Sequence, residues 1–204
     1  MIRIAMRVLT ACAILGLAGC ASAPLHYYTL VPPAGVPTNA GQTAGPPFEL
    51  LPVSVPAQVD QPQLLVRQGG QGVALLGSER WIAPLGDEVR SAMSADLSAE
   101  LNSQDVSGLP GNGKPRLRIK LDLRRFDSEP GSYALIEAAW SVRLLSGGDH
   151  AEPVACSSLI RETVAPGYAA LVQGHQRALG QLAAQMAAVA RSLAAGEPAR
   201  CPTG

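Results

Sequence analysis

Apolar and polar residues alternate along three consecutive segments in the second half of the chain. The alternation runs through residues 117–124, 136–144 and 154–160. Gly131 and the Gly147-Gly148 pair lie between these segments, where turns are expected. A period of two predicts β-strands that bury one face. Because the connections are short, we expect an antiparallel meander with one apolar and one charged face.

Two other segments have the spacing of amphipathic helices. In the first, apolar residues recur at every fourth position from Leu85 to Leu101. The second runs from Tyr168 to Leu193, and its apolar stripe comprises Val172, His175, Leu179, Leu182, Met186, Val189 and Leu193. Each stripe requires an apolar surface to cover. The chain is therefore expected to adopt a two-layer α+β fold, a largely antiparallel β-sheet with both helices packed on one face.

The first half of the chain carries shorter strand-like segments. Tyr27–Leu30 is β-prone, and residues 31–47 have the Pro-rich and Gly-rich composition of a loop or disordered excursion. Phe48–Val55 is apolar but contains Pro52, which favours an edge strand or a bulge. Two further strands, with a glycine turn between them, are expected at residues 63–68 and 73–82.

The N-terminus has the parts of a bacterial lipoprotein signal. Arg3 and Arg7 form a positive region, and residues 8–18 form an apolar core shorter than the roughly 20 residues that span a bilayer. Small residues then precede Cys20 in the lipobox pattern Leu-Ala-Gly-Cys, so we expect cleavage before Cys20 and acylation of this residue. An ordinary secretory signal with a chance cysteine is the alternative. Because Ala21 rather than Asp follows, the expected destination is the outer membrane.

This signal sets the expected domain organisation. Residues 1–19 are the signal peptide, residues 20–47 hold the lipidated cysteine, a short strand and a Pro/Gly-rich linker, and residues 48–204 form the α+β domain. Several acyl chains on Cys20 would anchor the mature chain to the lipid bilayer, on its periplasmic face, without spanning it. The mature chain is long enough for one domain with its own core.

Two further cysteines follow Cys20 in the mature chain, Cys156 and Cys201. In an oxidising compartment the economical interpretation is a disulfide between them, which would tie the C-terminal tail to the domain; two free thiols are the alternative. Neither lies in a Cys-x-x-Cys motif or a Cys/His cluster, so no metal or redox site is expected.

The composition and the histidines argue against several function classes. Lys plus Arg balances Asp plus Glu at 16 each, so nothing suggests a nucleic-acid partner. His26 lies near the anchor, His150 lies in a turn, and His175 lies in a helix stripe, where a core role is favoured over catalysis. No nucleophile has a histidine at a suggestive spacing. We therefore expect no catalytic site and no cofactor.

The charged face of the predicted meander is locally basic although the chain is neutral. Its candidate partner-binding residues are Arg118, Lys120, Arg124 and Arg143, with Arg125 beside them. Ordinary solubility is one interpretation of this face. The other is a docking surface for an acidic partner or for lipid head groups.

Three elements in order give the chain a family resemblance. Tyr27–Leu30 follows shortly after the lipobox, residues 53–64 read VSVPAQVDQPQL, and residues 80–85 read RWIAPL before a helix. With a closing amphipathic helix, this resembles the ABC-type transport auxiliary lipoproteins, which include the outer-membrane lipoprotein of the paraquat-inducible Pqi system. The similarity covers essentially the whole mature chain. Pro62, Arg80, Trp81 and Pro84 are interpreted as fold determinants, with Trp81 open between a core and an interface role.

The resemblance implies a non-enzymatic function in lipid transport. Members of this family accompany MCE-domain proteins and inner-membrane permeases that move lipids between two membranes. The implied role is to anchor or receive the periplasm-spanning MCE assembly at the outer membrane, with an MCE-domain protein as partner and a homo-oligomer left open. The alternatives are an outer-membrane assembly or structural lipoprotein and a lipid-binding shuttle with a cavity beside the last helix.

Overall fold

The structure is a computed structural model that describes residues 24–33, 45–111, 113–146, 149–150 and 152–202. The predicted signal peptide and Cys20 lie outside these residues, as does most of the predicted linker. The signal and the acylation of Cys20 therefore stay predictions.

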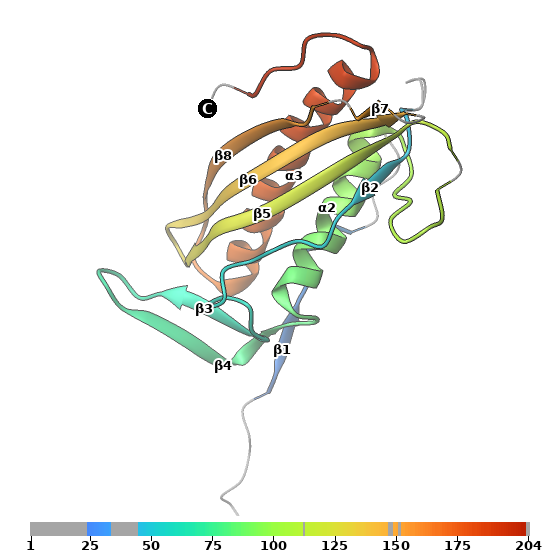
Figure 1. Cartoon of the computed structure of the whole chain (residues 1–204). Helices are drawn as coiled ribbons and strands as arrows, with labels where there is room; N and C mark the ends of the chain where they lie inside the picture. The colour runs from blue at the N-terminus through green and yellow to red at the C-terminus, as the bar shows by residue number, and fades with distance from the viewer. Residues whose placement is uncertain (1–23, 34–44, 112, 147–148, 151, 203–204) are drawn as a thin grey trace, which may run out of the picture.

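The predicted meander is confirmed as the centre of a five-stranded sheet (Figure 1). β5 (Arg116–Glu129), β6 (Tyr133–Ser146) and β8 (Val154–Thr163) pair antiparallel in that order. The two-residue strand β7 (Asp149–His150) also pairs with β6, and β2 (Phe48–Leu50) lies at the other edge beside β5. The edge position of the Pro52-containing segment is thus confirmed.

Both predicted helices cover one face of this sheet, and the α+β fold class is confirmed (Figure 1). α2 (Leu85–Leu101) and α3 (Tyr168–Ala194) begin at the predicted residues. Leu179, Leu182 and Met186 on α3 have no exposed surface, because they pack in the main core with the apolar residues of the sheet. The stripe read from the sequence is the buried face of the helix.

A second, three-stranded sheet lies at one end of the molecule (Figure 1). β3 (Gln63–Arg67) and β4 (Val73–Trp81) form the predicted hairpin, and β1 (His26–Tyr28) pairs parallel with β4. β2 also pairs parallel, with β5. These parallel pairings and the separate sheet were not predicted, because a three-residue strand carries too little pattern to specify its partner.

Gly174 permits the close approach of α3 to the sheet. A Cβ atom at this position would lie 2.3 Å from Cγ1 of Val164 and 3.1 Å from Cβ of Ala134. By contrast, a Cβ atom on Gly180, in the same helix, would meet nothing within 4 Å. The first glycine is required by packing, and the second is not.

Candidate interaction surface

The outer face of the five-stranded sheet, opposite the helices, carries the residues predicted to bind a partner. In Figure 1 the sheet lies in front of both helices, so this face points toward the viewer. The strand register sets Arg118 of β5 directly opposite Arg143 of β6, and Lys120 opposite Ser141. Arg124 follows on β5, at the irregularity between Leu123 and Arg125. We call Arg118, Lys120, Arg124 and Arg143 the basic face.

Arg118 is the one member of the basic face with an ion pair among the described residues. Its Nε lies 3.1 Å from Oε2 of Glu49 on β2, and Nε of Arg116 lies 3.5 Å from the same oxygen. Lys120, Arg124 and Arg143 make no ion pair within the part of the chain that the structure describes. Three cations of this face are therefore available to a partner.

The other end of the outer face is balanced in charge. Oδ2 of Asp127 forms ion pairs with Nη2 of Arg125, at 2.6 Å, and with Nη2 of Arg67 on β3, at 3.1 Å. The hydrogen bond to Asp127 raises the pKa of Arg125 above its ordinary value. Arg125, which neighbours the basic face in the sequence, is thus neutralised locally. Lys120, Arg124 and Arg143 differ from Arg125 in having no such carboxylate partner among the described residues.

A shallow hollow adjoins Arg124 on the same side of the sheet. Its lining includes Arg124, Glu137, Ala139, Ser157 and Pro202. The C-terminal tail contributes to it because Cys156 on β8 and Cys201 form the predicted disulfide, with Cα atoms 5.4 Å apart. The disulfide thus fixes the tail at the edge of the sheet.

The two sequence motifs of the family resemblance meet in the fold. The amide of Trp81 donates to the carbonyl of Pro62 at 2.8 Å, and Gln63 pairs with Arg80. Trp81 is buried, with its ring edge-on to Phe126 at 6.1 Å, so its core role is confirmed. Val53, Val55, Asp60, Pro84 and Arg90 line one surface hollow where the two motifs adjoin α2.

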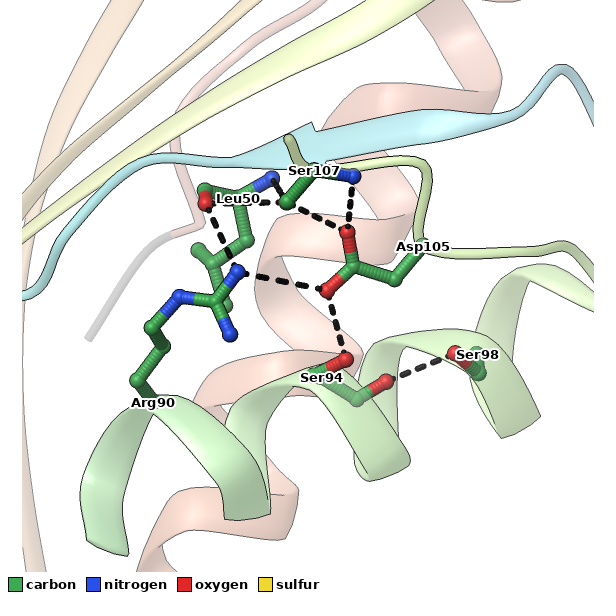
Figure 2. A network of polar contacts seen from close by, with 6 residues as sticks. All are labelled: Leu50, Arg90, Ser94, Ser98, Asp105 and Ser107. Atoms are coloured by element: carbon green, nitrogen blue, oxygen red, sulfur yellow. Dashed lines mark hydrogen bonds and ion pairs between the residues drawn. The ribbon is translucent and has the colours of Figure 1, made fainter. Parts of the chain in front are cut away.

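Asp105 organises a polar network between α2 and β2 (Figure 2). One carboxylate oxygen accepts the Ser107 amide at 2.8 Å and also the Ser107 hydroxyl; the other accepts the Ser94 hydroxyl at 2.6 Å and faces Arg90 at 3.8 Å. Burial alone would raise the pKa of Asp105, but these hydrogen bonds outweigh it and hold the pKa below its ordinary value. Because both carboxylate oxygens of Asp105 already accept hydrogen bonds, we interpret its role as structural rather than catalytic. The role of Asp105 was not predicted from the sequence.

Two buried glutamates connect the N-terminal segment to the rest of the fold, and neither role was predicted from the sequence. Glu79 accepts the Tyr28 hydroxyl at 2.7 Å and lies 2.9 Å from Nδ1 of His26. Glu88 of α2 accepts the Thr29 hydroxyl and the Leu30 amide, each at 2.8 Å. Burial and the hydrogen bond to Glu79 raise the pKa of Tyr28 to about 12.

The histidines take structural positions. His175 has no exposed surface; its ring stacks on Phe126 at 3.9 Å, and its Nε2 lies 2.8 Å from the Ser128 hydroxyl. Burial lowers the pKa of His175 to about 3, so the ring is neutral. The core role that the helix stripe favoured for this residue is confirmed. His26 contacts Glu79, and His150 lies in β7.

Comparison with known families identifies the class of protein. Residues 28–187 match the family described as the ABC-type transport auxiliary lipoprotein component, and the chain belongs to this family. The family resemblance drawn from the sequence is thereby confirmed, while the lipobox lies outside the matched residues. A search of curated proteins by sequence finds no match. Among the described residues, no helix is long and apolar enough to cross a membrane.

Solved structures share the fold at low sequence identity. An uncharacterized protein is 17% identical, with 83% of this chain and 99% of that chain covered and a TM-score of 0.61. A protein of Xanthomonas campestris assigned to the family DUF330 is also 17% identical, with 79% and 92% covered and a TM-score of 0.56. These similarities support the assignment of the α+β fold.

Proposed function

We propose that this chain is the non-catalytic, lipid-anchored component of an ABC/MCE-type system for lipid transport between two membranes. Acylated Cys20 anchors it at the periplasmic face of the outer membrane. The folded domain holds or receives the periplasm-spanning MCE assembly there. Family membership supports the transport role, since the family is that of an auxiliary lipoprotein component.

The observation that carries the docking role is the basic face. Lys120 and Arg124 are exposed, and with Arg143 they have no carboxylate partner among the described residues. Unpaired cations on a face that the helices leave uncovered suit an acidic partner surface, because complementary charge speeds and orients association. The proposed partner is therefore an MCE-domain protein with an acidic docking surface.

The packing of α3 favours this role over that of a lipid-binding shuttle. A shuttle would need a cavity between the sheet and the Leu/Met stripe of α3. Leu179, Leu182 and Met186 have no exposed surface and fill that position themselves. The hollow between α3 and the C-terminal tail reaches Val189 of the stripe, but neither this hollow nor those at α2 and Arg124 is lined by Leu179, Leu182 or Met186. The helix–sheet layer supplies a closed core rather than a binding chamber.

The first experiment is an in-cell crosslink and affinity capture of the tagged full-length protein. Wild type is compared with Cys20→Ala and with the triple variant Lys120→Glu/Arg124→Glu/Arg143→Glu. We expect wild type to recover an MCE-domain protein, Cys20→Ala to recover less, and the triple variant to lose most of it. Arg200→Glu, which alters an exposed cation of the C-terminal tail, is the control and should behave as wild type.

The outcomes separate the parts of the proposal. Recovery of an outer-membrane barrel or an exporter in place of an MCE-domain protein would indicate the assembly role and overturn the transport role. If the triple variant recovers as much MCE-domain protein as wild type, the docking site does not lie on the basic face. Crosslinks between copies of the chain would identify the homo-oligomer that the sequence left open.

A further inference from the structure

The position of Cys20 limits how far the three-stranded sheet can lie from the membrane. Five residue steps separate Cys20 from Leu25, which directly precedes β1. A fully extended chain covers at most about 3.6 Å per residue, so the reach is no more than ~18 Å. This argument rests on the acylated anchor of the proposed function. It requires the end of the molecule where β1 enters to stay close to the lipid surface.

Large apolar side chains are exposed at this end. Leu25 is 49% exposed, Tyr27 of β1 is 59% exposed, and Ile82, directly after β4, is 67% exposed. The amide of Ile82 donates to the carbonyl of Tyr28 at 2.9 Å, so Ile82 adjoins β1. We call Leu25, Tyr27 and Ile82 the apolar patch. Exposed apolar side chains in a group indicate a contact that the isolated chain does not show.

The strand register places a basic residue beside the apolar patch. Tyr27 lies opposite Arg80 of β4 in the parallel pair. Arg80 makes a hydrogen bond to the carbonyl of Gly77 and no ion pair within the described residues. Aliphatic side chains, a tyrosine and a cation in one place are the composition that settles at the interface between lipid head groups and acyl chains.

The patch is held in a fixed orientation. His26, between Leu25 and Tyr27, points to the opposite side of β1, where its Nδ1 contacts Glu79. Tyr28 also bonds to Glu79, and Thr29 and Leu30 bond to Glu88 on α2. The patch is thus coupled through these hydrogen bonds to the same helix that packs on the main sheet.

We propose that the apolar patch of Leu25, Tyr27 and Ile82 inserts into the head-group region of the phospholipid membrane that holds acylated Cys20. The chain then contacts the membrane at two sites, the acyl chains and the patch. A single flexible tether would let the domain rotate, whereas the second contact fixes its orientation. The occupant of the patch is lipid, not a protein partner.

The experiment places a reporter in the patch and another outside it. Tyr27→Trp and Leu109→Trp are made in the full chain, which is processed in cells and reconstituted in phosphatidylethanolamine/phosphatidylglycerol vesicles with brominated acyl chains. Leu109 is 65% exposed in the loop that follows the C-terminal end of α2, whereas Ile82 lies just before the N-terminal end of this helix, so position 109 is remote from the patch. Native Trp81 and Trp140 are buried, and wild type supplies their background emission.

We expect the emission of Trp at position 27 to shift to shorter wavelength and to be quenched by the brominated lipid, with no change at position 109. An unshifted and unquenched emission at position 27 would overturn membrane insertion. The mass of the N-terminal peptide is measured on the same sample. A peptide without acyl groups would overturn the anchor itself, whereas an acylated peptide with unquenched emission would overturn only the inference about the patch.

Discussion

The two sheets of this protein are stabilised in different ways. The centre of the five-stranded sheet is built from three long strands, β5, β6 and β8, and α3 covers it with a buried apolar stripe. The three-stranded sheet joins a hairpin to β1, which comes from a distant part of the chain. Hydrogen bonds to Glu79 and Glu88 hold the segment that begins with β1.

This difference separates two parts of the molecule. The five-stranded sheet with its helices forms the body, and the three-stranded sheet with the N-terminal segment forms what we call the attachment end. The large sheet depends on apolar area that is spread over many buried residues. The attachment end depends on a few buried carboxylates, so single substitutions there should loosen the N-terminal segment and spare the body. The following predictions test that contrast, from the largest expected effect to the smallest.

Loss of the disulfide should have the largest effect. Replacing Cys156 and Cys201 by Ser frees a loop with a sequence separation of 45 residues. We expect the free energy of unfolding to fall by about 2–4 kcal/mol, because the unfolded chain gains entropy. Denaturant unfolding of wild type and of the double variant measures this. An unchanged midpoint would show that the tail adds nothing to the large sheet.

Gly174→Ala should destabilise the contact between α3 and the sheet. The added methyl would overlap Val164, and we expect a loss of about 1–3 kcal/mol in the free energy of unfolding. The matched control is Gly180→Ala, which has open space around it and should stabilise the helix by roughly 0.5–1 kcal/mol. Thermal unfolding compares the two. Equal effects would contradict the close approach at Gly174.

Glu88→Ala should release the N-terminal segment. It leaves the buried amide of Leu30 without its acceptor, at a cost of about 1–3 kcal/mol. Hydrogen exchange should accelerate at Leu30 and leave β5 and β6 unchanged. Asp87→Ala, at the exposed neighbouring position, is the control and should leave exchange as in wild type. Acceleration across the whole molecule would show that the two regions unfold together.

His175, which lies at the junction of the two sheets, should make the free energy of unfolding depend on pH. Phe126 of β5 contacts both His175 and Trp81 of β4. Burial lowers the pKa of His175 from 6.5 to about 3, so between these values the unfolded state binds a proton that the folded state does not. Stability should fall as the pH falls below 6.5, with a slope of at most ~1.4 kcal/mol per pH unit. Denaturant unfolding at several pH values should show this slope for wild type and its loss in His175→Gln.

The predicted elements and the structure agree where the pattern is long. The meander, α2 and α3 follow from the sequence, because a buried face repeats many times in each long element. The Cys156–Cys201 disulfide was expected for another reason, that these two cysteines remain after Cys20 in an oxidising compartment. The pairing of the three-residue strands β1 and β2 could not be predicted from the sequence. The interactions of Glu79 and Glu88 were also missed, since nothing near them in the sequence identifies acceptors for residues more than fifty positions away.

The basic face shows the same division within one site. Alternation alone predicts that Arg118, Lys120, Arg124 and Arg143 point away from the apolar side of the sheet. Only the parallel pairing of β2 brings Glu49 to Arg118, and only the attachment of β3 brings Arg67 to Asp127. Tertiary contacts thus decide which charges of this face are already paired.

The sequence by itself determined the family, the long elements and the faces that they bury, because periodicity and local motifs are properties of neighbouring residues. The tertiary structure alone decided how the short strands pair, which charges are neutralised and where the apolar patch lies relative to Cys20. Those features depend on contacts between residues far apart in the chain, and such contacts exist only once the core has brought the segments together.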